Sequence, residues 1–353
     1  MRVLAADIGF GTTDILVYDD SLPIENCPKL VIPSRTQQVA AAIRQATSQG
    51  LPVVMTGVTM GGGPSGAALR AHLAAGLPFY AGRGAAFTFN DDLDKVRSWG
   101  VVIIEDPDAA PAHSIPIFSG DLDMPRLMEA LASLGVDPRF DGACVAVQDH
   151  GFSPGASNRK FRFRLWRELL GRDPSLGSLA WTAAEIPAPY TRMQATASLL
   201  AGQVPHVVMM DTGPAALWGA LLSRPDQRPM LAVNVGNGHT LAALVENGAI
   251  QGLVEHHTSL LDREKFEKLI RRFAAAELSD DEVFSEGGHG CIPPSGPVEL
   301  DGLTPLPVTG PRRESVAGGR LSLEFAAPLG DMMLTGCFGL LEAYRRLIPD
   351  HAS

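Results

Sequence analysis

The chain has 353 residues, of which 45% are hydrophobic and 19% charged, and its formal net charge is −10. This length predicts about two domains with substantial cores, and the composition excludes a disordered or fibrous chain. Because acidic residues outnumber basic ones and no basic stripe occurs, nucleic acid is disfavoured as a partner. No apolar run is long enough to cross a bilayer, and the amino terminus lacks a signal-peptide pattern. We therefore expect a cytoplasmic protein with no membrane partner.

Apolar runs separated by turn residues predict strands that alternate with helices, which is typical of an α/β protein. Strands are expected at 2–8, 14–19, 29–33, 52–58, 101–105, 142–148, 206–210, 230–235, 240–246, 249–254 and 305–309. Helices are expected at 36–49, 65–75, 91–98, 125–134, 191–201, 213–222, 261–276 and 328–347. Residues 151–190 are predicted to be an irregular excursion, and the Pro/Gly-rich stretch 287–297 to be a long loop.

One pattern occurs twice in the chain. Residues 4–20 (LAADIGFGTTDILVYDD) and residues 231–247 (LAVNVGNGHTLAALVEN) each contain an apolar strand, a glycine turn and a second apolar strand. A dinucleotide-binding glycine turn must open a helix, whereas Asp14 and the β-prone run ILVY follow the first turn here. Each repeat is therefore predicted to be a β-hairpin. Two such hairpins can present backbone N–H groups to one set of phosphate oxygens; the alternative is two ordinary hairpin turns.

These motifs resemble those of the superfamily of acetate and sugar kinases, heat-shock ATPase chaperones and actin. Its first phosphate motif is similar to residues 7–14, its second to residues 234–240 and its adenosine motif to residues 306–311. The resemblance implies an α/β, actin-like ATPase fold of two lobes, each similar to ribonuclease H. The first lobe is expected over residues 1–205, with an inserted subdomain at about 36–140. The second is expected over residues 206–353, with a closing carboxy-terminal helix.

The resemblance also implies ATP and Mg²⁺ as cofactors. Asp7 is expected to position Mg²⁺ and to act in catalysis, since Mg²⁺ prefers a few carboxylates together with retained waters. Asn234 stands where the family usually has Asp, which is compatible with slow turnover, and the nearest candidate for the acid that orients an attacking water is Asp211. The residues expected to hold the nucleotide are Gly9, Gly11, Thr12, Thr13, Asn234, Gly236, Gly238, Thr240 and Gly310.

A third group of polar residues is expected to contact a substrate. Residues 148–151 (QDHG) follow a predicted strand, at the point where sugar kinases of the superfamily have a substrate loop. Asp149 is a candidate general base for an attacking hydroxyl; the alternative is that it caps the loop. Residues 255–258 (EHHT) and 287–291 (GGHGC) are the other candidate patches. The expected substrate contacts are Gln148, His150, His256, His257 and His289.

Histidines and cysteines raise the question of a transition metal. His239, His256, His257, His289 and Cys291 together have the composition of such a site, but they lie on separate segments. Substrate hydrogen bonding and structural roles are therefore favoured over metal binding. Each of the four cysteines is more than 40 residues from the next, which predicts isolated reduced thiols.

The chain also resembles a narrower, functionally undescribed family that carries the signatures at 148–151, 255–258 and 287–290. Some members are labelled activators of a glycyl-radical enzyme, but an iron–sulfur cluster for that chemistry needs clustered cysteines. We therefore expect an ATP- and Mg²⁺-dependent phosphotransferase that acts on a small hydroxylated or acidic molecule. The alternatives are an ATP-driven activator or chaperone-like switch with a protein partner, and a non-catalytic ligand-binding protein. A homodimer is left open.

Overall fold

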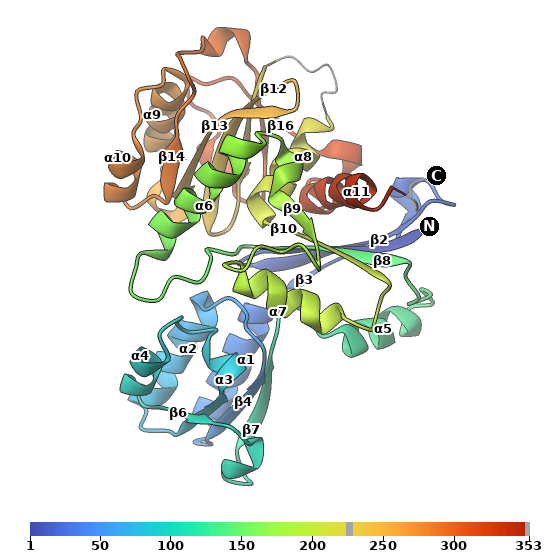
Figure 1. Cartoon of the computed structure of the whole chain (residues 1–353), viewed down its shortest axis with the longest axis vertical. Helices are drawn as coiled ribbons and strands as arrows, with labels where there is room; N and C mark the ends of the chain where they lie inside the picture. The colour runs from blue at the N-terminus through green and yellow to red at the C-terminus, as the bar shows by residue number, and fades with distance from the viewer. Residues whose placement is uncertain (224–228, 350–353) are drawn as a thin grey trace.

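The computed structural model describes residues 1–223 and 229–349, whose strands form three sheets (Figure 1). The first sheet has the order β3-β2-β1-β8-β10-β9. Its antiparallel part pairs β1 with β2 and β2 with β3, and β8 and β10 continue it parallel to β1. The bounds are β1 (Arg2–Ile8), β2 (Thr12–Asp19), β3 (Lys29–Pro33), β8 (Gly142–Val147), β9 (Ala180–Thr182) and β10 (His206–Met210).

The second sheet repeats this arrangement, with the order β14-β13-β12-β11-β15-β16. An antiparallel meander of β11, β12 and β13 is again followed by strands parallel to its first member. The shared strand order confirms the predicted two-lobed, actin-like α/β fold. The bounds are β11 (Met230–Val235), β12 (His239–Glu246), β13 (Ala249–His257), β14 (Gly290–Ile292), β15 (Leu306–Thr309) and β16 (Leu323–Phe325).

The third sheet belongs to an insertion between β3 and β8, within the stretch predicted at about 36–140. Its four strands run parallel in the order β6-β5-β4-β7 and have their own apolar core. Figure 1 shows this blue-to-cyan unit at the end of the molecule away from the second sheet. It comprises α1 (Arg35–Ser48), β4 (Val53–Gly57), α2 (Gly63–Ala74), β5 (Phe79–Gly82), α3 (Arg83–Ala86), α4 (Leu93–Ser98), β6 (Val101–Ile104) and β7 (Ile115–Ser119). The helix that follows, α5 (Met124–Ser133), packs in the core of the first sheet instead.

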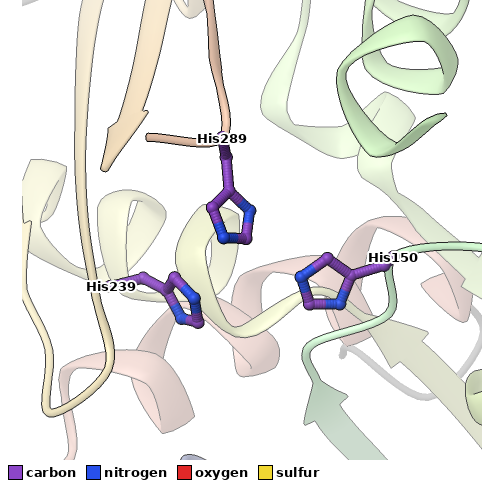
Figure 2. A group of neighbouring side chains, drawn as sticks. All are labelled: His150, His239 and His289. Carbon is purple, nitrogen blue, oxygen red and sulfur yellow. The ribbon is translucent and has the colours of Figure 1, made fainter. Parts of the chain in front are cut away.

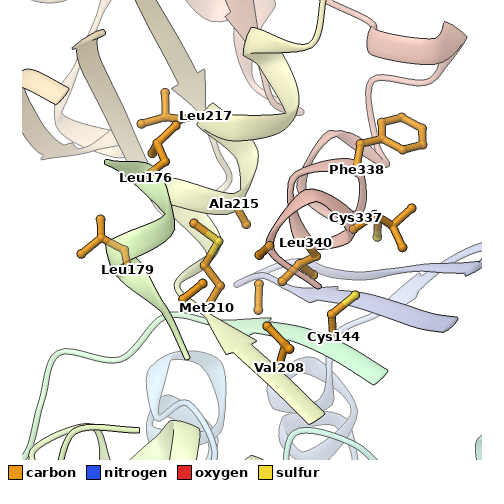
Figure 3. Close-up of a cluster of buried hydrophobic side chains, with 14 of the residues drawn as sticks. Cys144, Leu176, Leu179, Val208, Met210, Ala215, Leu217, Cys337, Phe338 and Leu340 are labelled. Atoms are coloured by element: carbon orange, nitrogen blue, oxygen red, sulfur yellow. The ribbon is translucent and has the colours of Figure 1, made fainter. Parts of the chain in front are cut away.

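Two helices, α8 (Thr212–Leu221) and α11 (Thr335–Leu347), pack against each other between the first and second sheets. Figure 3 shows the surrounding core, in which Val208 and Met210 of β10 meet Ala215 of α8 and Leu340 of α11. The two helices approach closely because glycines lie at their crossing. A Cβ atom at Gly339 would overlap the carbonyl oxygen of Ala215.

Replacing Gly339 with Ala is therefore expected to destabilise the protein by about 1–3 kcal/mol, the usual cost of forcing extra volume into a packed core. Gly171 is the matched control, because it is also helical but has open space where a Cβ would stand. Gly171→Ala should stabilise by about 0.5–1 kcal/mol, since Ala loses less chain entropy in a helix. Urea unfolding of both variants checks this. Equal effects would show that the helix crossing tolerates a methyl group.

The remaining helices include two that were not predicted from the sequence, α10 (Asp280–Ser285) and the longer α6 (Asn158–Arg172). Residues 151–190, predicted to be irregular, contain the 15-residue α6. Its buried face comprises Arg162, Phe163, Trp166 and Leu170. The charged Arg162 occupies a core position, which breaks the apolar periodicity that marks a helix. The other helices are α7 (Thr191–Leu200) and α9 (Arg263–Ala274), and short 3₁₀ turns lie at Ile24–Asn26, Pro107–Ala109, Leu176–Leu179, Thr258–Leu260, Leu300–Gly302, Arg313–Val316 and Pro328–Gly330.

Two boundaries differ from the sequence-based expectation. The final helix, predicted from residue 328, begins at Thr335, because Leu329 takes a positive φ of 51° that a helix does not allow. Strand β10 lies in the first sheet, so that sheet extends beyond residue 205, where the second lobe was expected to start. The expected second lobe also includes residues 224–228 and 350–353, which lie outside the described residues. Across the described part of the chain, every helix is too short or too polar to span a lipid bilayer.

Candidate functional site

A cleft of about 440 Å³ opens where the two glycine hairpins meet, a volume in the range of small-molecule sites. Both hairpins close with the same bond at 2.9 Å, from Gly9 N to Thr12 O and from Gly236 N to His239 O. Their tips are in contact, because a Cβ at Gly11 would lie 2.5 Å from the Asn237 amide nitrogen. The cleft-lining residues from the predicted nucleotide set are Gly9, Thr12, Asn234, Gly236, Gly238 and Gly310.

Two carboxylates face the cleft from the first hairpin. Asp7 on β1 pairs with Asp14 on β2, and both line the cleft. Within the described residues, Asp7 Oδ1 and Asp14 Oδ1 are buried without a hydrogen-bond partner. Burial and the charge of Asp14 raise the pKa of Asp7 well above its usual value, and burial raises the pKa of Asp14 to about 7. Such a pair fits a hard divalent cation like Mg²⁺.

Two further members of the predicted nucleotide set, Thr13 and Thr240, do not line the cleft, and Gly310 also has a structural role. Thr13 and Thr240 are buried. The Thr240 hydroxyl lies 3.0 Å from that of Thr258, which donates to the Gly236 carbonyl oxygen at 2.9 Å. Gly310 has a φ of +95°, and a Cβ there would press on the carbonyl oxygen of Val235. Its role is therefore a close backbone approach between β15 and the end of β11.

The loop after β8 carries Gln148, Asp149 and His150 to the cleft, next to the end of β1, with which β8 pairs. Both Asp149 carboxylate oxygens accept backbone N–H bonds, from Gly151 at 2.8 Å and Met193 at 3.0 Å. Burial raises the pKa of Asp149 to about 6, against the opposing effect of those two bonds. Asp149 therefore caps the loop and ties it to α7, with a carboxyl group that titrates near neutral pH.

A buried arginine joins the two lobes behind this loop. Arg162 on α6 is fully buried and forms two bonds to Asp211, at 2.6 and 2.8 Å. It also donates to Glu255 on β13 at 3.0 Å and to the Asp149 carbonyl oxygen at 2.8 Å. Burial by itself raises the pKa of Glu255, but Arg162 and then His289 outweigh it and hold that pKa well below its usual value.

Three histidines from separate segments converge beside this arginine. His150 lies in the loop after β8, His239 starts β12 and His289 precedes β14, and their rings point toward a common centre (Figure 2). One ring nitrogen of each lies within 4.8 Å of the others. Burial, reinforced by Arg162, holds the pKa of His150 well below its usual value, and burial lowers the pKa of His239 to about 3. Both rings are therefore neutral at physiological pH.

The other predicted contacts lie around this group. The His257 ring is 4.9 Å from that of His239 and 4.7 Å from that of His289. Strand alternation directs the neighbouring His256 to the opposite face of β13, where its ring lies close to Gly288. Burial raises the pKa of the Cys291 thiol to about 12, so Cys291 is protonated and packs as a core residue.

Sequence reasoning singled out Asp7, His150 and His289 but missed the importance of Asp14 and Arg162. Asp14 had a usable signal, because a hairpin that turns between Gly9 and Thr12 must place residues 7 and 14 opposite each other. Arg162 had none, since its partners Asp211 and Glu255 lie 49 and 93 residues away in the chain.

Comparison with known proteins gives one family, and loosely similar solved structures that include the two described below. The model of the family described as "Putative pyruvate format-lyase activating enzyme (DUF1786)" matches residues 60–315, which is more than half of the chain. The ethanolamine utilization protein EutJ from Carboxydothermus hydrogenoformans is 12% identical with a TM-score of 0.35, covering 96% of this chain and 89% of its own. An exopolyphosphatase-like protein is 9% identical with a TM-score of 0.29, and the match covers 100% of this chain and 92% of that protein. No curated protein matches.

Proposed function

The chain belongs to the family described by that model, which confirms the narrower resemblance found in the sequence, and we propose that it is an ATP- and Mg²⁺-dependent phosphotransferase acting on a small hydroxylated or acidic molecule. One observation carries the proposal. The two glycine hairpins meet at a cleft that also holds the unpartnered carboxylate oxygens of Asp7 and Asp14. Backbone amides together with a cation site are what a triphosphate requires.

In this proposal each wall of the cleft has a separate task. Asp7 and Asp14 hold Mg²⁺, and the hairpin backbones hold the phosphate groups. The end of β15 and the residues before α11 border the nucleoside, through Thr309, Gly310, Pro311, Met332 and Met333. ATP supplies the phosphoryl group when bound. The acceptor lies against Gln148 and His150, where Asp149 takes the proton of its hydroxyl group; a pKa near 6 suits a base at neutral pH.

A nucleotide titration with a matched pair of variants tests the proposal. ATP with Mg²⁺ should bind in calorimetry and raise the melting temperature. Gly238→Ala places a methyl group in the cleft, 3.5 Å from Phe10, which is ordinary contact; it should therefore weaken binding by about tenfold, or 1.4 kcal/mol, without unfolding the protein. Gly296→Ala, which has open space around it, should bind ATP like the wild type.

Two outcomes would contradict this proposal. One is the absence of ATP binding by the wild-type protein in the presence of Mg²⁺. The other is ATP binding by Gly238→Ala with unchanged affinity. If ATP binds as expected, phosphoryl transfer is tested by ³¹P NMR with pools of hydroxylated and carboxylic metabolites as acceptors.

A second candidate is an ATP-driven activator of another enzyme; the family description names an activating enzyme. The replacement of a second carboxylate by Asn234 favours it, because a switch needs only slow turnover. Chemistry at an iron–sulfur cluster does not fit, since Cys27, Cys144 and Cys337 are buried free thiols among apolar side chains. A partner protein captured only in the presence of ATP, with no phosphorylated metabolite formed, would favour the activator.

A further inference from the structure

We propose that His150, His239 and His289 form a binding site for a divalent transition metal, with Zn²⁺ as the best match. This site is distinct from the Mg²⁺ position at Asp7 and does not depend on nucleotide. Three imidazole nitrogens suit zinc and its neighbours in the first transition row, whereas Mg²⁺ prefers oxygen ligands.

The three rings are close to the geometry that a metal ion requires. Two nitrogens bound to one zinc ion at about 2.1 Å are at most about 4.2 Å apart, and the histidine nitrogens already lie within 4.8 Å of one another. Small rotations of the side chains therefore bring all three into range. Figure 2 shows the rings arriving from three directions around one centre, as a tetrahedral ion requires.

His289 is buried with its hydrogen-bonding capacity unsatisfied among the described residues. Its side chain is 1% exposed, and among the described residues neither ring nitrogen makes a hydrogen bond of acceptable geometry. Nδ1 nevertheless lies 3.0 Å from Glu255 Oε2. Buried polar atoms in folded proteins are normally paired. A metal on Nε2 satisfies one nitrogen and leaves Nδ1–H directed at Glu255.

Glu255 and Arg162 support the rings from behind. Metal-binding histidines usually present their second nitrogen to a carboxylate, which fixes the ring and makes it a better ligand. Glu255 stands in this position toward His289 and is itself held by Arg162. Arg162 brings one positive charge against the two negative charges of Asp211 and Glu255. The buried group therefore has a net charge of −1, which favours a cation beside it.

Three protein ligands leave one coordination position open, as in catalytic rather than structural zinc sites. His150, His239 and Glu255 line the cleft, so this position faces the cleft interior. It would take an oxygen atom of a small hydroxylated or carboxylic ligand. Only this last step rests on the proposed function; metal binding itself does not.

Zinc and cobalt titrations test the site without nucleotide or substrate. The chelator-treated wild-type protein should bind one Zn²⁺ per chain in equilibrium dialysis. Co²⁺ should give the visible absorption bands of a tetrahedral site, and X-ray absorption of the zinc form should show nitrogen ligands at about 2.0–2.1 Å. His289→Ala and His239→Ala should lose this binding. Glu255→Gln should weaken it by about 10–100-fold.

His113→Ala is the control, because His113 is exposed in the insertion and its loss should leave the binding unchanged. Wild-type protein that binds no Zn²⁺ would overturn the proposal. Equal binding by wild type and His289→Ala would also overturn it. If the histidine variants do not fold, the ligand type seen in the wild-type X-ray absorption decides alone. ATP binding by the same metal-free protein is measured separately, so each proposal can fail without the other.

Discussion

Asp7→Asn is expected to abolish the response to ATP and Mg²⁺ and, at the same time, to make the ligand-free protein more stable. Both effects have one cause, a buried carboxylate that lies beside Asp14 and whose Oδ1 has no hydrogen-bond partner in the described chain. The amide keeps the size of the side chain but cannot provide the charge that attracts Mg²⁺. Turnover should fall by about 100-fold or more, as for other losses of a preorganised electrostatic group.

The gain in stability follows from the raised pKa of Asp7. A carboxyl group whose pKa is higher in the folded protein than in the unfolded chain stabilises the fold fully at a pH below its unfolded pKa. This contribution to stability is lost as the pH rises through the folded pKa. For Asp7 and Asp14 the loss begins near pH 4, and for Asp14 it extends to about pH 7. Asp7→Asn removes the Asp7 part of this loss. The gain should be about 1.4 kcal/mol for each pH unit over which Asp7 loses its stabilisation, counted up to pH 7.

Thermal unfolding between pH 4 and pH 8, with and without ATP and Mg²⁺, measures both effects. Asp301→Asn is the control, because it changes the net charge equally at an exposed position. It should alter neither the pH profile nor the response to nucleotide. An Asp7→Asn protein that is less stable than wild type at pH 7 would show that Asp7 serves the fold. An undiminished response to nucleotide would remove Asp7 from the site.

Arg162→Ala is expected to cost about 3–5 kcal/mol of stability, the usual result of leaving buried charges without their partner. The substitution strands Asp211 and Glu255 and also removes the guanidinium that stacks on the Trp166 ring, 4.0 Å from its centroid. Because natural proteins are stable by only about 5–15 kcal/mol, Arg162→Lys is the milder companion variant. It keeps the charge but cannot make the paired bonds to Asp211.

The control lies on the same helix. Arg164 is exposed and contacts the Phe161 ring, so Arg164→Ala should change the free energy of unfolding by less than about 0.5 kcal/mol. The pH dependence of the free energy of unfolding gives a second test of the role of Arg162. The pKa of Glu255 is lowered in the folded protein, so its contribution is present above about pH 4.5 and lost on acidification through the folded value. Arg162→Ala should reduce the amount of stability that is lost on acidification. A cost equal to that of Arg164→Ala would mean that the buried charges find other partners.

Local patterns identified much of this molecule. The repeated strand, glycine turn and strand at 4–20 and 231–247 predicted two hairpins, and β1–β2 and β11–β12 are those hairpins. Such predictions succeed because strand alternation and turn chemistry act over a few residues. Short strands such as β5 and β14 were missed, since three or four residues are too few for a period to show.

The sequence by itself determined the α/β class, the paired hairpins and the presence of histidine-rich loops, because each is written in neighbouring residues. Only the tertiary structure decided which of these residues meet. It placed Asn237 against Gly11, brought His150, His239 and His289 together from three segments, and buried Arg162 between two carboxylates. Contacts of this kind depend on how sheets and helices pack over long sequence separations, and the order of residues along one chain does not encode them locally.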